Sequence, residues 1–95
     1  MAEGTVYARR MRAEIERWAR EIARIEARMA DAGAAMRAEG MLQIADLRAR
    51  QAEAEAQWRT VAAEGATLRP EVRRDFESRY AAFSEATKTA ARRFA

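Results

Sequence analysis

The chain of 95 residues contains no cysteine and no histidine. It therefore has no disulfide bond, no thiolate nucleophile, few of the usual zinc ligands and no side chain that ordinarily titrates near neutral pH. One proline and four glycines are its only strong helix breakers. No apolar run approaches the roughly 18 residues that a transmembrane helix needs. These absences argue against disulfide-rich, zinc-binding and membrane-spanning proteins.

Large aliphatic side chains are also scarce. Leucine, isoleucine, valine and phenylalanine together number 13, whereas alanine alone numbers 25. Alanine is the strongest helix former but buries little apolar area, so we expect a helical chain with a thin core. Because such a core stabilises a monomer only marginally, we expect the chain to gain stability by oligomerisation.

Charged residues make up 35% of the chain, and the formal net charge is +3. The two signs interleave along the sequence, as on solvated helical faces, which argues against a nucleic-acid groove. The first 18 residues carry charges throughout and have no apolar segment of the secretory type. We therefore expect a soluble, cytoplasmic protein without a nucleic-acid partner.

Helical periodicity begins in the N-terminal half. Apolar residues recur there at spacings of four and three residues, the heptad pattern of coiled coils. This first series comprises Met11, Ile15, Trp18, Ile22, Ile25, Met29, Ala32 and Met36. A second series, offset by one residue, comprises Ile44, Leu47, Gln51, Ala54, Trp58 and Val61. Each series predicts a long helix with one apolar face, and a polar residue such as Gln51 within it can fix register or partner number.

The clearest break in the sequence is AAEGATLRPEV, at residues 62–72. Gly65 suits a helix C-terminus, Pro70 cannot continue a helix interior, and Glu71 suits the first turn of the next helix. An amphipathic helix over about 71–94 is predicted to follow. Its apolar face contains the aromatic residues Phe76, Tyr80, Phe83 and Phe94.

The segment DAGAAMRAEGMLQIADL, at residues 31–47, decides between two architectures. If the helix continues, residues 36, 40 and 44 form a stutter that keeps the apolar series on one face, and a helix over about 6–63 spans roughly 85 Å. If the chain turns back near 36–40, two helices pair antiparallel about residue 38, which places Trp18 opposite Trp58. Residues between Gly33 and Gly40 are mostly strong helix formers, so the continuous helix is favoured.

We therefore predict an all-α fold with a single coiled-coil domain over residues 1–95. It has one long helix over about 6–63 and a shorter antiparallel amphipathic helix over about 71–94. A three-helix bundle with a turn near 36–40 is the alternative. Two long helices are expected to pair antiparallel between chains, with Gly40 at their crossing. The predicted oligomer interface comprises Met11, Ile15, Trp18, Ile22, Ile25, Met29, Gly40, Ile44, Leu47, Gln51, Trp58 and Val61.

Two stretches, RAEIERWAREIARIEARMADAGA and QIADLRARQAEAEAQW, are followed by the shorter amphipathic helix. Over roughly residues 7–85 this arrangement resembles a group of small bacterial coiled-coil proteins of about a hundred residues and uncharacterised function. The resemblance implies a continuous helix in the middle of the chain. It implies no catalytic residues.

No catalytic pattern accompanies the helices. The carboxylates lie at helical positions expected to face solvent, and no nucleophile motif, phosphate loop or dinucleotide fingerprint is present. We expect a non-enzymatic self-assembly or scaffold protein without cofactor, metal or small-molecule substrate. Its expected partner is itself, as a homodimer or higher oligomer, or another helical protein. The alternative is a peripheral protein of a lipid surface or granule, with Phe76, Tyr80, Phe83 and Phe94 facing the membrane.

Overall fold

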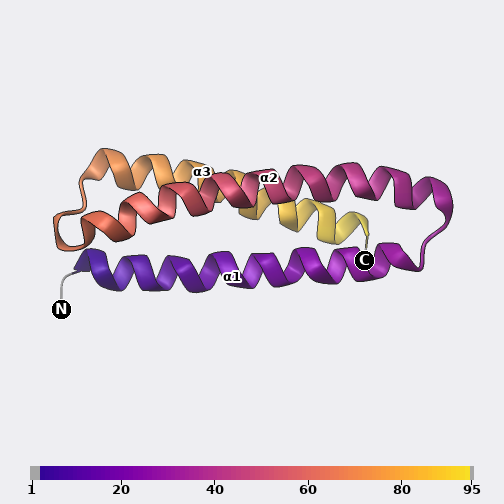
Figure 1. Cartoon of the computed structure of the whole chain (residues 1–95), viewed down its shortest axis with the longest axis horizontal. Helices are drawn as coiled ribbons and strands as arrows, with labels where there is room; N and C mark the ends of the chain where they lie inside the picture. Colours follow the sequence, from indigo (N-terminus) through magenta and orange to yellow (C-terminus); the bar gives the residue numbers. More distant parts are fainter. Residues whose placement is uncertain (1–2, 95) are drawn as a thin grey trace.

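Three α-helices, seen side by side in Figure 1, form the computed structural model of the chain. The structure describes residues 3–94. The helices are α1 (Glu3–Ala30), α2 (Ala34–Glu64) and α3 (Pro70–Arg93), and a short 3₁₀ helix, η1 (Gly65–Thr67), joins α2 to α3. α2 runs antiparallel to α1, and α3 returns along both in a bundle of 50 × 20 × 17 Å. The all-α prediction is confirmed, in its three-helix form.

The connection between α1 and α2 is a tight link at residues 31–33. Backbone N–H groups of Asp31 and Ala32 donate to carbonyl groups in the last turn of α1, which ends the helix. Gly33 then adopts an extended backbone (φ −66°, ψ 163°) and precedes α2. The Arg37 backbone N–H donates to the Gly33 carbonyl at 2.9 Å, and the Arg37 guanidinium donates to the Ala32 carbonyl. The predicted continuous helix over 6–63 is therefore wrong, and the turn precedes the alternative position of 36–40.

Burial explains why the chain turns back. The two heptad series face inward, and α3 closes the core over them, so one chain covers its own large apolar side chains. The buried members include Ile22, Ile25, Leu47, Phe76 and Phe83. A single long helix would leave both series in water until a second chain arrived, at a cost of about 25 cal/mol for each Å² of apolar surface left exposed.

The connection between α2 and α3 is as predicted. Gly65 has a positive φ of 50°, which favours glycine, and its N–H donates to the Val61 carbonyl. The Glu64 carboxylate accepts hydrogen bonds from the Arg69 backbone N–H at 2.9 Å and from its guanidinium at 3.0 Å. These bonds lower the pKa of Glu64. Pro70 is the first residue of α3, where its missing N–H costs nothing.

The register between α1 and α2 differs from the hairpin register centred on residue 38. The Trp58 indole N–H donates to the Ala8 carbonyl at 2.7 Å, whereas the Trp18 indole N–H donates to the Tyr80 hydroxyl at 3.0 Å. The two tryptophans thus have separate partners. Gly40 lies against Met29, because a Cβ at position 40 would overlap the Met29 sulfur. The close approach predicted at Gly40 therefore occurs within one chain.

Candidate functional site

The residues predicted to form an oligomer interface lie in the core of a single chain. Most of them are buried there: Met11, Ile15, Ile22, Ile25, Met29, Gly40, Ile44, Leu47 and Val61. Trp18, Gln51 and Trp58 are half-buried at its edge. The Gln51 side-chain carbonyl accepts a hydrogen bond from Arg48 at 3.0 Å and so points to the rim. The folded chain therefore covers most of these positions itself.

The aromatic face of α3 is also internal. Phe76, Phe83 and Phe94 are buried, and Tyr80 is half-buried. Phe76 packs edge-on against Tyr7 of α1, with ring centroids 6.2 Å apart, and stacks with Tyr80 at 6.0 Å. Packing within the three-helix bundle therefore covers the residues on which the lipid-surface alternative depended.

Two tyrosines link α1 to α3 by polar contacts. The Tyr7 hydroxyl donates to Glu77 at 2.9 Å, and Arg73 lies 4.1 Å from the centroid of the Tyr7 ring. Burial, assisted by the Glu77 carboxylate, raises the pKa of Tyr7 to about 12. The Tyr80 hydroxyl donates to Glu14 at 3.2 Å. Burial is the main cause of the raised pKa of Tyr80. These contacts hold the bundle together and bring no reactive group into a cavity.

The face of α2 that points away from the other two helices carries a third heptad series. Its members are spaced by three and four residues and all are exposed. We call this series the outer stripe: Ala35, Ala38, Leu42, Ala45, Ala49, Ala52 and Ala56. Leu42 is 76% exposed, and Met41 beside it is 71% exposed. An apolar row thus faces water on a helix whose opposite face already forms the core.

Charges of opposite sign flank the outer stripe. On the side of α1 lie Arg37 and Arg48, and Arg48 pairs with Glu26 of α1 at 2.7 Å. On the side of α3 lie Glu39 and Glu53, which pair with arginines of α3, Glu53 at 3.4 Å. Among the residues of α2 itself, the edge toward α1 is predominantly basic, although it includes Glu55, and the edge toward α3 is predominantly acidic, although it includes Arg50. Ion pairs with residues of α1 and α3 partly neutralise both edges.

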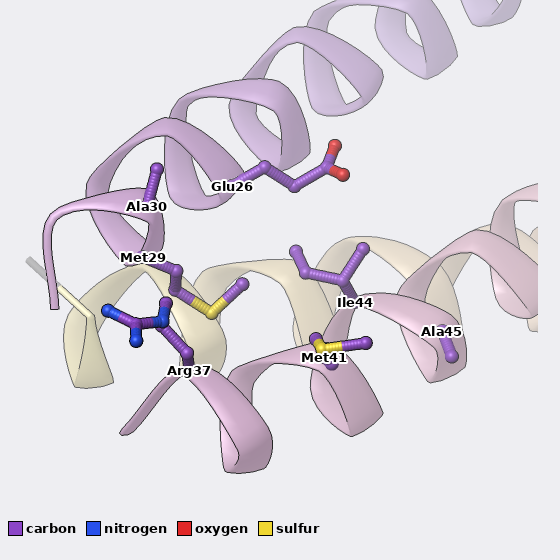
Figure 2. Close-up of a pocket in the computed structure, with 7 residues that line it drawn as sticks. All are labelled: Glu26, Met29, Ala30, Arg37, Met41, Ile44 and Ala45. Atoms are coloured by element: carbon purple, nitrogen blue, oxygen red, sulfur yellow. The ribbon is translucent and has the colours of Figure 1, made fainter. Parts of the chain in front are cut away.

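A crevice adjoins the outer stripe between α1 and α2. Figure 2 shows the Met29 side chain from α1 and the Ile44 side chain from α2 reaching toward each other across it. Its volume is about 480 Å³, and it is lined by Glu26, Met29, Ala30, Arg37, Met41, Ile44 and Ala45. One carboxylate and one guanidinium accompany an otherwise apolar lining, an arrangement suited to holding an apolar side chain.

Other features of the described residues, 3–94, bear on binding. They contain no group of three or more aspartates and glutamates placed to hold a metal ion. None of the helices among them has an uncharged apolar stretch of the length that crossing a bilayer requires. Comparisons of the chain with protein-family models, with curated protein sequences and with solved structures find no match.

The outer stripe is not evident from the sequence, because the large apolar residues dominate the periodic pattern. Six of the seven members are alanines, which are common everywhere in this chain and favour helix wherever they occur. The signal that the sequence does contain is a lack of charge along this series. No charged residue occupies a heptad position of this series between 35 and 56, although charged residues make up 35% of the sequence.

Proposed function

We propose that the chain is a non-enzymatic self-assembly protein whose outer stripe on α2 pairs with the outer stripe of a second copy. The exposure of Leu42 within an uncharged heptad row, with the exposed Met41 beside it, carries the proposal. A helix face that meets only water ordinarily holds charged residues, as the outer faces of α1 and α3 do. A heptad row of small and aliphatic residues instead suits packing against another helix.

The charged edges of the stripe favour a second copy in parallel orientation. A two-fold axis along α2 brings the basic edge of one copy beside the acidic edge of the other. Arg48 then faces Glu53 of the second copy, at the offset where flanking residues of parallel paired helices meet. Antiparallel pairing would place edges of like charge together. The same symmetry packs Leu42 against Leu42 of the second copy.

The dimensions of the stripe predict a weak association. Residues 35–56 span about 32 Å at 1.5 Å per residue, and a helix presents a face about 10 Å wide. The two copies together would bury about 650 Å², less than the roughly 1,000 Å² of a stable interface. Alanine adds little apolar area, so Leu42 and Met41 supply most of the favourable energy. We expect a dissociation constant in the micromolar range or weaker.

Sedimentation equilibrium over a range of concentrations tests the proposal. The average mass of the wild-type chain should rise toward that of a dimer, whereas Leu42→Lys should lose this reversible association because it buries an unpaired charge. Ala81→Lys is the matched control, since Ala81 is an exposed alanine on the outer face of α3, and it should behave as the wild type. A wild-type chain that stays monomeric at millimolar concentration would contradict the proposal.

Cross-linking tests the orientation. The chain has no cysteine, so a single introduced one reports a single contact. Leu42→Cys and Ala56→Cys should each form disulfide-linked dimers on their own, because parallel pairing places identical residues together. Dimers that form only when the two variants are mixed would contradict the parallel arrangement.

A further inference from the structure

The inner apolar series of α2 extends beyond the part that the hairpin covers. Met36 lies one helical turn before the buried Gly40, on the same face, yet it is 41% exposed. α1 ends at Ala30, so no residue of α1 lies opposite Met36. A second crevice of about 490 Å³ opens beside it, lined by Arg28, Met29, Asp31, Ala32, Met36, Arg93 and Phe94. Met36 is therefore an inner apolar residue that the hairpin covers only in part.

The inner apolar residues of α1 and α2 would fall on one face of a helix that continued through the link at residues 31–33. Met29 and Gly40, which face each other in the hairpin, are eleven residues apart in sequence. Eleven residues make three helical turns, so a helical link would place the inner residues of α1 and α2 along one face. Residues 31–33 contain no proline and can join a helix. The link is therefore compatible with either a turn or a continuous helix.

We propose that two copies of this chain can exchange α1 through residues 31–33. In the exchanged dimer, the link of each copy is helical, and α1 of each copy packs on α2 and α3 of the other. α3 stays with its own α2, because Gly65 with its positive φ and Pro70 at the start of α3 prevent their connection from becoming helical. The hydrogen bonds from Trp18 to Tyr80 and from Trp58 to Ala8 are kept, but they join two copies.

What changes on exchange is the environment of the link. The two continuous helices cross antiparallel near residue 35, which brings the second copy's helix opposite Met36 and covers this residue. The outer stripe remains exposed on the far face of α2, so the exchange does not depend on the proposed pairing through that stripe.

Two neighbouring substitutions act on the link in opposite directions. A Cβ at Gly33 meets no atom within 4 Å, and the extended backbone there suits any residue, so the hairpin accepts Gly33→Ala. A helical link gains from the same change, because alanine favours helix over glycine. Ala34 is the first residue of α2, where proline is favourable, and the extended Gly33 suits the position before proline. Ala34→Pro therefore fits the hairpin and breaks a continuous helix.

Refolding at high protein concentration, followed by light scattering after dilution, tests the exchange. We expect a dimer fraction that persists on dilution, because exchange back requires α1 to leave the core. The dimerisation constant should rise about fifteen- to thirtyfold in Gly33→Ala and fall at least a hundredfold in Ala34→Pro, since each dimer contains two links. Equal dimer fractions in Ala34→Pro and the wild type would overturn the proposal, as would the absence of dimer from both the wild type and Gly33→Ala.

Disulfide connectivity separates exchange from pairing through the outer stripe. The contact between Gly40 and the Met29 side chain brings the two Cβ positions close enough for the pair Met29→Cys and Gly40→Cys. In a monomer or a stripe-paired dimer this disulfide closes within one chain, whereas in the exchanged dimer it joins two chains. Interchain disulfides in the dimer fraction should persist when Leu42→Lys is added. If every disulfide in that fraction is intrachain, exchange is overturned while the proposed function stands.

Discussion

The first and second helices have similar lengths and similar inner faces but different outer faces. α1 presents charged residues to solvent, among them Arg20 and Arg24, whereas α2 presents the outer stripe. Alanine stabilises both helices locally, so helix formation does not require the difference. The inner face of each helix must be apolar because it is buried. The outer face can instead carry charged residues that favour solubility or apolar residues that favour contact with another helix. The absence of charge from one outer face, rather than an excess of apolar residues, therefore distinguishes α2 from α1 and is the basis of the proposed self-association.

The largest expected effect comes from two leucines on opposite faces of α2. Leu47 is 1% exposed and Leu42 is 76% exposed. Leu47→Ala should lower the free energy of unfolding by about 2–5 kcal/mol, because it leaves a cavity in the core. Leu42→Ala should change the stability of the monomer by less than about 0.5 kcal/mol and weaken its self-association. Chemical denaturation at low protein concentration measures the free energy of unfolding of both variants. Equal losses of stability would contradict the conclusion that Leu47 lies in the core and Leu42 on the surface.

A smaller effect is expected where α1 and α2 approach most closely. Gly40→Leu should lower the free energy of unfolding by about 1–3 kcal/mol, because the new side chain occupies the space of Met29. Shortening the neighbour, in Gly40→Leu combined with Met29→Ala, should restore part of this loss. Thermal denaturation checks the pair, and a double variant less stable than either single variant would show that the two residues do not share this space.

The sequence predicts some parts of this fold well, for physical reasons that concern particular residues. Gly65 and Pro70 fix the second connection through backbone constraints that act locally, and the spacing of Val72, Phe76 and Phe83 is enough to identify the inner face of α3. The turn at 31–33 has no comparable local cause. Residues 31–33 can also adopt a helical conformation. The turn is favoured because it allows α3 to bury the inner apolar series of both α1 and α2. This burial is a property of the whole chain.

The candidate surface was hidden from sequence analysis for a related reason. From the sequence, the large residues of the heptad series are expected to form contacts between chains, because a thin core stabilises a monomer only marginally. Three helices instead bury residues such as Ile22 and Ile25 completely within one chain. Only after these residues are assigned to the core does Leu42 remain as a large apolar residue in a second, uncharged row.

The contacts between α1 and α3 give a dependence of stability on pH in the alkaline range. The pKa of Tyr7 is about 12 in the fold, against a usual value of 10.0. Because the fold favours the neutral phenol, its contribution is complete below pH 10 and is lost as the pH rises from about 10 to about 12. The expected loss is at most about 2 kcal/mol. Denaturation across this range should be less steep in pH for Tyr7→Phe, and unchanged steepness would contradict this origin.

The smallest expected effect concerns the charged edges of the outer stripe. Arg48 and Glu53 are exposed, so Arg48→Glu and Glu53→Arg should each change the stability of the monomer by less than about 1 kcal/mol. In a parallel pair each change places like charges together and should weaken association several-fold, and the doubly exchanged variant should recover it because the attraction is restored with its signs reversed. High salt should reduce these differences. Sedimentation equilibrium on the wild type, the two single variants and the double variant measures this coupling. Losses that simply add in the double variant would mean that Arg48 and Glu53 do not meet across the two copies, and would leave the outer stripe as an apolar contact without a defined direction.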